Sequence, residues 1–277
     1  MGHVLPLAEL ARRLHDAHGF TATVLTFASS DSAAQRGFLA SLPPAVAAAS
    51  LPAVPLDDLP AGAAIETLLS VEAERSIPAL TAVLRGLKAT TNLVVFVADL
   101  FGADTLRAAR LSLMLHLPRL DAELISGGEF RDLAEPVRLP GCFPVPGADI
   151  LQPLQDRASD AYRWMVHHGG KYRDAAGILV NTFDTAEPGA AAVLRRPEPW
   201  RPPVDPVGPV IRRAAADDDG VDPTSCVAWL DAQPDRSVLL VSFGSGGALA
   251  TAQMDELARG LELSREIVFI SNTPTIK

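Results

Sequence analysis

The sequence predicts an α/β fold built from largely parallel sheets. Strand-like apolar runs alternate with amphipathic helical runs along the 277 residues, and no internal repeat interrupts the alternation. Several of the strand-like runs are continuously apolar, which is typical of parallel sheets that are covered on both faces. A chain of this length can bury a substantial core, in one large domain or in two of ordinary size.

The composition excludes several classes of function. The formal net charge of −9 argues against a nucleic-acid or anionic-membrane partner, because phosphate binding needs clustered Lys and Arg. No apolar run reaches the ~20 residues of a membrane span, and no leader peptide is recognisable. Cys142 and Cys226 lie far apart and match no metal-binding spacing, so we expect them to be reduced. These features predict a cytoplasmic monomer without stable membrane insertion.

The first elements form most of a βαβ unit. Pro6 suits the first position of a helix and Gly19 suits its end. The strand-like run "FTATVLTF" follows, rich in β-branched residues. Because the helix comes before this strand, we expect the first strand of the unit to lie upstream of Met1. The apolar face of the helix consists of Leu7, Leu10, Ala11 and Leu14.

Two longer helices are expected in the next part of the chain. Residues 42–62 are punctuated by prolines and indicate a loop with one short strand. A helical pattern then covers residues 65–88, with an interruption expected at Pro78. A second helical pattern begins at residue 105 and is expected to end before Pro118.

Two continuously apolar runs predict strands that are buried on both faces. They are "NLVVFVAD" at residues 92–99 and "GILVNTF" at residues 177–183. Between them, a helix is expected from about residue 156 to residue 171, within whose end lies the sequence "HHGGK". Adjacent histidines on a helix point in different directions, which disfavours a metal or phosphate site there. We expect Gly169 to act as the C-cap of this helix instead.

A proline-rich stretch predicts the boundary between two domains. The sequence "RPEPWRPPVDPVGPV" contains six prolines and cannot continue a helix or strand, and an acidic stretch follows it. We therefore expect one domain at residues 1–208, a linker at 209–223 and a second domain at 224–277. The second domain should contain a helix at 225–234, a strand at 237–243, a helix at 251–264 with Thr251 as a candidate N-cap, and a strand at 267–271.

Two distant residues are candidates for a catalytic pair. His3 precedes the first helix, whose positive end favours the neutral imidazole that can act as a base. Asp99 ends an apolar strand, at the edge of a parallel sheet where α/β folds bind ligands. If the two meet, they form a His–Asp dyad that activates a hydroxyl. The alternatives are an ordinary loop histidine for His3 and a helix N-cap for Asp99, a role for which Asp104 competes.

The run "VSFGSGG" is a candidate phosphate-binding turn. A strand leads into Gly244, Ser245 and Gly246, and a helix follows, so backbone N–H groups are available at the helix start. The turn is not the dinucleotide fingerprint, because Leu249 occupies the third glycine position, and it is not a P-loop. The alternative is a tight strand-to-helix turn without a ligand.

Seven segments together resemble the plant UDP-dependent glycosyltransferases, most closely the hydroquinone glucosyltransferase (arbutin synthase) type. The resemblance keeps its order from Met1 to about Ser264 and implies the GT-B fold of two Rossmann-like domains, an acceptor domain at 1–208 and a UDP-sugar domain of which 224–277 is only a part. The segments are "GHVLPLAELARRL", "VADLFGAD", "LPGCFPV", "GILVNTF", "PVGPV", "WLDAQP" and "VSFGSGG".

The resemblance implies roles for the candidate residues. His3 matches the general base that deprotonates the acceptor hydroxyl, and Asp99 matches its charge-relay partner. Ser245, with Gly244 and Gly246 beside it, matches a contact to the donor diphosphate. The implied reaction is a single inverting displacement that transfers glucose from UDP-glucose to a small phenol, with no metal or other cofactor.

The chain also departs from the family pattern. The strand and turn expected before Gly2 are missing, and between Leu106 and Ser112 a strand and loop that help to line the acceptor pocket are missing. After Ser264 the donor signature box is missing, so we expect UDP-glucose to bind weakly at best. These departures suggest a truncated chain whose bare strand edges favour aggregation. The alternative function is therefore an inactive remnant that binds an acceptor or a full-length homologue.

Overall fold

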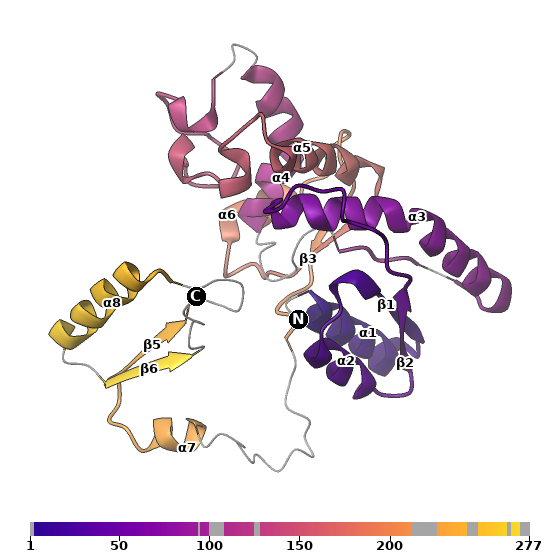
Figure 1. The fold of residues 1–277 in the computed structure, drawn as a ribbon, viewed down its shortest axis with the longest axis horizontal. Helices are drawn as coiled ribbons and strands as arrows, with labels where there is room; N and C mark the ends of the chain where they lie inside the picture. The colour runs from indigo at the N-terminus through magenta and orange to yellow at the C-terminus, as the bar shows by residue number, and fades with distance from the viewer. Residues whose placement is uncertain are drawn as a thin grey trace. The chain divides into compact units, whose positions relative to one another are not determined.

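A computed structural model describes residues 3–93, 95–99, 108–124, 128–211, 226–242, 249–264 and 267–271 (Figure 1). The chain divides into two compact units, Met1–Arg212 and Arg213–Lys277. Most of the expected linker lies outside the described residues. Every described strand pairs with a parallel neighbour, as predicted for an α/β chain.

The first unit contains six α-helices and four strands among its described residues. The helices are α1 (Val4–His18), α2 (Ala33–Ala40), α3 (Ile65–Thr90), α4 (Ala108–Glu123), α5 (Asp160–Lys171) and α6 (Pro188–Leu194). The strands are β1 (Ala22–Phe27) and β2 (Val46–Leu51), which pair with each other, and β3 (Ile178–Val180) and β4 (Val204–Pro206), which form a second pair. Short 3₁₀ helices lie at Ala28–Ser30, Phe130–Asp132, Gly147–Asp149, Gln152–Leu154 and Tyr172–Asp174.

The helix α1 begins earlier than its proline suggested and buries a different face. It starts at Val4 with His3 as the N-cap residue, and it ends at Gly19, which adopts a left-handed conformation with φ of 70°. Ala11 packs with Val24 of β1 and Val46 of β2, because small side chains let the helix lie close to the strands. The expected apolar face is therefore wrong in part, since Leu7, Leu10 and Leu14 are only half-buried.

Two helices continue through a proline at which a break was expected. Proline removes one N–H donor and leaves the carbonyl four residues earlier without its helical partner. In α3, Pro78 and Glu74 are both exposed, so water can satisfy that carbonyl. In α4, Pro118 lies inside the helix, which extends to Glu123. The predicted interruptions at both prolines are therefore wrong.

Gly169 lies inside α5 and does not cap it. A Cβ atom at this position would lie 2.6 Å from the carbonyl oxygen of Met114 and 3.2 Å from Cδ of Pro118, both in α4. The glycine thus allows α5 to pack closely against α4, beside the proline. The C-cap residue is Tyr172, so the prediction of a cap at Gly169 is wrong.

The proline-rich stretch contains a strand that the sequence did not suggest. β4 pairs with β3 in the register Ile178↔Val204 and Val180↔Pro206. Among the described residues β3 is the only strand that pairs with β4, which suits an edge strand, where proline is tolerated.

The segment at residues 92–99 was predicted to be a buried strand, and this prediction is wrong. Its described residues form no strand, and Val95, Phe96 and Val97 are exposed. A strand needs hydrogen-bonded neighbours, and none of β1 to β4 pairs with this segment. Apolar composition alone therefore did not produce a buried strand here.

The main hydrophobic core of the first unit surrounds α4 and α5. Leu111, Leu115 and Leu117 of α4 are almost completely buried, as are Phe130 and Leu154 from the connection between the two helices. Burial of such side chains contributes roughly 1.5–3 kcal/mol each. This core therefore holds α5, and the residues that follow it, in a fixed place.

The second unit contains two helices and one parallel strand pair among its described residues. They are α7 (Cys226–Asp231), β5 (Val238–Ser242), α8 (Thr251–Ser264) and β6 (Ile267–Ser271), with β5 paired to β6. Thr251 is the first residue of α8 and not its N-cap. The start of α8 is stabilised by Gln253, whose side-chain oxygen accepts a hydrogen bond from the N–H of Ala250 at 2.9 Å.

Candidate active site

The structure brings His3 and Asp99 together across 96 positions of sequence. His3 is the N-cap residue of α1, and Asp99 ends the apolar segment that follows α3. The His3 Nδ1 atom lies 2.8 Å from Oδ2 of Asp99. The histidine side chain is 48% exposed and the aspartate side chain is 12% exposed. The carboxylate is thus largely shielded, while solvent reaches the imidazole.

This arrangement fixes which imidazole nitrogen can act as a base. A carboxylate only accepts hydrogen bonds, so in the neutral ring Nδ1–H of His3 donates to Asp99. The lone pair is then on Nε2, which can take a proton from a hydroxyl group. The start of α1 disfavours a positive charge on the ring, whereas Asp99 favours it. The aspartate therefore orients the ring and stabilises the protonated form.

Tyr172 lies near Asp99 and was not found from the sequence. It follows α5 directly, and its side chain is buried. Burial, with a contribution from the negative charge of Asp99, raises the pKa of Tyr172 to about 12. The phenol therefore stays neutral near the carboxylate. No sequence signal marked this residue, because a tyrosine after a helix end is common.

The candidate phosphate turn cannot be placed in the structure. Gly244, Ser245 and Gly246 lie outside the described residues. The elements on either side are described: β5 ends at Ser242 and α8 begins at Thr251. The strand expected before these residues and the helix expected after them are both present.

The histidine pair near the end of α5 has a structural role for one of its members. His168 is buried, its Nε2 lies 3.0 Å from Oγ of Ser70 in α3, and its ring stacks on Trp164. Burial, with a contribution from His167, lowers the pKa of His168 to about 4. Since the Ser70 hydroxyl donates to the carbonyl oxygen of Glu66, it accepts from Nε2–H of His168.

Metal-binding clusters and membrane-spanning helices are both absent from the described residues. No group of three or more His, Cys, Asp or Glu side chains among them is arranged to hold a metal ion. In the same part of the chain, no helix combines the length and apolar character needed to cross a bilayer.

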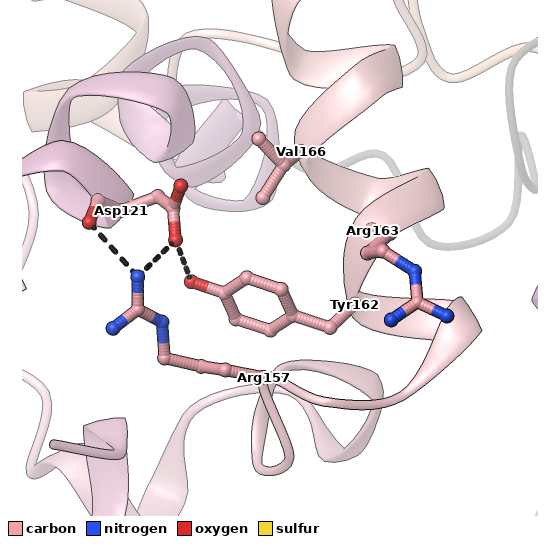
Figure 2. Close-up of a pocket in the computed structure, with 5 residues that line it drawn as sticks. All are labelled: Asp121, Arg157, Tyr162, Arg163 and Val166. Carbon is pink, nitrogen blue, oxygen red and sulfur yellow. Dashed lines mark hydrogen bonds and ion pairs between the residues drawn. The ribbon is translucent and has the colours of Figure 1, made fainter. Parts of the chain in front are cut away.

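A shallow pocket of about 330 Å³ lies between the end of α4 and the start of α5 (Figure 2). The Tyr162 hydroxyl donates to Oδ1 of Asp121 at 2.6 Å, and Nη2 of Arg157 donates to the same oxygen at 2.7 Å. Arg157 also donates to the carbonyl oxygens of Asp121 and Leu124. Burial, with Asp121, raises the pKa of Tyr162. These groups bond to one another, so the pocket is a structural joint between the two helices. Its lining residues are Asp121, Arg157, Tyr162, Arg163 and Val166.

The curated proteins that are similar to this chain include plant glycosyltransferases. No protein-family model matches it. It is 42% identical over 295 residues to the hydroquinone glucosyltransferase of Rauvolfia serpentina, covering 100% of this chain and 62% of that protein. It is 44% identical over 287 residues to UDP-glycosyltransferase 72B1 of Arabidopsis thaliana, covering 96% of this chain and 59% of that protein. The chain thus spans about three-fifths of the length of these curated relatives.

Solved structures show the same fold. One is a UDP-glucosyltransferase from Polygonum tinctorium, capable of glucosylating indoxyl, in complex with 3,4-dichloroaniline. Its TM-score is 0.88 at 40% identity, covering 98% of this chain and 63% of that one. Another is Phytolacca americana UGT2 with UDP-2-fluoro-glucose and pterostilbene. Its TM-score is 0.86 at 35% identity, covering 99% of this chain and 70% of that one. These similarities confirm the predicted α/β fold class of the GT-B type.

Proposed function

The chain belongs to the plant UDP-dependent glycosyltransferases of family 1, and we propose that it supports inverting transfer of glucose from UDP-glucose to the hydroxyl of a small phenol. The observation that carries this proposal is the 2.8 Å contact between Nδ1 of His3 and Oδ2 of Asp99. The chain spans about three-fifths of the length of its relatives, so the activity, substrates and partners of the whole protein are part of the proposal.

In the proposed mechanism His3 is the general base. Asp99 accepts the hydrogen bond from Nδ1–H, and Nε2 takes the proton of the phenol as its oxygen forms a bond to the anomeric carbon of glucose. The bond from that carbon to the UDP oxygen breaks, UDP leaves with the electron pair, and the configuration inverts. The proton remains on His3, where the carboxylate of Asp99 stabilises the imidazolium.

The names of similar proteins support the proposed substrates. One relative is called a hydroquinone glucosyltransferase, and a structural neighbour is described as capable of glucosylating indoxyl. A second neighbour is in complex with UDP-2-fluoro-glucose. We therefore assign a small phenol as acceptor and UDP-glucose as donor. The turn with Gly244, Ser245 and Gly246 is the proposed contact to the donor diphosphate.

Two finer features of the proposal rest on the same pair and on the composition. We propose that the reaction uses no metal, since His3 and Asp99 supply the base. Transfer should then persist in EDTA, and a loss of transfer in EDTA would contradict this. A cytoplasmic location follows from the expectation that Cys142 and Cys226 are reduced.

The experiment measures glucose transfer from UDP-glucose to hydroquinone. It uses this chain alone and a fusion to the remaining C-terminal part of the Rauvolfia serpentina enzyme. In the fusion, His3→Ala should lower kcat about 10²- to 10⁴-fold, the usual contribution of general base catalysis. The control His18→Ala, at the other end of α1, should leave kcat unchanged. An unchanged kcat in His3→Ala would refute the assignment. Hydroquinone binding without transfer, by chain and fusion alike, would favour the inactive acceptor-binding remnant.

A further inference from the structure

A buried carboxylate on α1 orients two neighbouring arginines. Glu9 is buried, and its carboxylate accepts hydrogen bonds from Nε of Arg12 at 2.9 Å and from Nε of Arg13 at 2.7 Å. Burial opposes the ionisation of Glu9, but the hydrogen bonds from the two arginines outweigh it and lower the pKa of this carboxyl. The charged carboxylate therefore fixes the direction in which each guanidinium points.

Arg13 connects α1 to a part of the chain that is distant in sequence. Its Nη2 atom donates to the carbonyl oxygens of Pro209 and Ile211, each at 3.1 Å, across sequence separations of 196 and 198. Val210 lies between these two residues and is buried. Its N–H donates to Oδ1 of Asn181, directly after β3, at 2.6 Å. Residues 209–211 are therefore held by α1 on one side and by the end of β3 on the other.

These bonds tie the helix that carries His3 to the part of the first unit that lies near Asp99. The helix α1 packs on β1 and β2 in a small core, whereas β3 and Tyr172 belong to the main core. Tyr172 lies near Asp99. Two contacts therefore join α1 to the main-core side: His3 with Asp99 at its start, and Arg13 with residues 209–211 nearer its end.

We propose that Glu9 and Arg13 form a brace that positions His3 against Asp99, and that both are positioning residues for the base of the reaction. The effect on catalysis rests on the proposed function, but the state of the imidazole can be measured without it. Arg13 lies about 15 Å along the helix from His3, so it acts through the rigid helix between them.

A small movement of α1 is sufficient to separate the pair. The N-cap lies about 12 Å along the helix from Ala11, where α1 packs on the strands, so a rotation of about 5° there moves His3 by roughly 1 Å. Nδ1 of His3 and Oδ2 of Asp99 are 2.8 Å apart, and roughly 1 Å more takes them beyond hydrogen-bonding range. Asp99 then no longer restricts the neutral ring to the tautomer with its hydrogen on Nδ1.

Nitrogen NMR of the histidine rings tests the brace in this chain, at a pH where the rings are neutral. The His3 signal is assigned by its loss in His3→Ala, and in the wild type it should show the hydrogen on Nδ1. Arg13→Gln should shift it towards a mixture of the two tautomers, as Asp99→Ala should. Arg12→Gln is the matched control, because Arg12 bonds to carboxylates of α1 itself, and it should leave the signal unchanged.

A milder variant covers the case in which Arg13→Gln does not fold, which circular dichroism checks. Arg13→Lys keeps the charge and a donor, but one ammonium group cannot bond to Glu9 and to both carbonyl oxygens with the geometry of the guanidinium. It should therefore shift the His3 signal in the same direction and by a smaller amount.

Turnover in the fusion enzyme tests the consequence for catalysis. Arg13→Gln should lower kcat for hydroquinone about tenfold or more and change KM much less, because the brace positions the base and not the acceptor. Arg12→Gln should leave both constants unchanged. The same His3 tautomer in the wild type and in both Arg13 variants would overturn the proposal, as would equal shifts in Arg12→Gln and Arg13→Gln. A tautomer shift confined to the Arg13 variants, without transfer by the wild-type fusion, would support the brace and contradict the proposed function.

Discussion

Lowering the pH should destabilise the first unit through His168. In the folded chain, burial lowers the pKa of this histidine from its ordinary value of 6.5 to about 4. In the unfolded chain, the ring is exposed to water and has its ordinary pKa. Between these two values the unfolded chain binds a proton that the folded chain does not, so the stability present above 6.5 is lost as the pH falls through this window.

The size of the effect follows from the two pKa values. The difference in proton binding corresponds to a loss of about 2 kcal/mol in the free energy of unfolding between about pH 7 and about pH 5. Burial is the larger cause of the shift, and the charge of His167 adds to it. Protonation would also require the folded chain to solvate a cation between Trp164 and Ser70.

Urea unfolding at the two pH values measures this loss. His168→Gln keeps a group that can donate to Ser70 but cannot gain a charge, so it should remove about 2 kcal/mol of the pH dependence even if it is less stable overall. His167→Gln, at an exposed position, should retain most of it. Other groups, such as Glu9, also titrate in acid, and the comparison between variants cancels their effect. Equal pH dependence in wild type and His168→Gln would refute the reasoning.

Two substitutions test the packing around α4. The carboxylate of Glu187 accepts hydrogen bonds from the N–H groups of Ala108 and Ala109 at 2.8 and 3.1 Å, so Glu187→Ala should lower the free energy of unfolding by about 1–2 kcal/mol in urea titrations; an unchanged midpoint would contradict this capping role. Gly169→Ala should destabilise by about 1–3 kcal/mol, because its Cβ would crowd α4. Gly170→Ala meets no atom within 4 Å and should be neutral or stabilising, so equal effects at the two glycines would contradict the close packing.

The elements that could be predicted from sequence are those whose signals are local. The run "FTATVLTF" became β1, and the second-unit strands and helices appear where alternation placed them. The order of helix and strand was sufficient for the α/β class. Gly19 ends α1 as expected, because a left-handed residue at a helix end depends on that residue alone.

The errors occur where distant residues decide the outcome. Pro118 and Gly169 are local signals for a helix end, yet they pack against each other between α4 and α5, and both helices continue. The apolar run that ends in Asp99 has strand composition, but pairing needs neighbours from elsewhere in the chain. β4 was missed because the prolines in and around it argue against a strand, although an edge strand tolerates proline.

The candidate site was predictable only in part. His3 and Asp99 could be named as a conditional pair, and their meeting depends on how the chain folds across a sequence separation of 96. Tyr172 could not be found, because its nearness to Asp99 comes from the packing of α5 and not from any pattern around it. The roles of Gly244, Ser245 and Gly246 rest on the family resemblance and on the order of the strand before them and the helix after them.

The most direct test of the central claim compares two phenols in the fusion enzyme. A base is needed for a weakly acidic phenol such as hydroquinone, but much less for a strongly acidic phenol that is already ionised. The account predicts that His3→Ala slows transfer to hydroquinone about 10²-fold or more and slows transfer to the acidic phenol far less. An equal loss for both phenols would contradict it, because His3 would then act through binding or folding and not as the base.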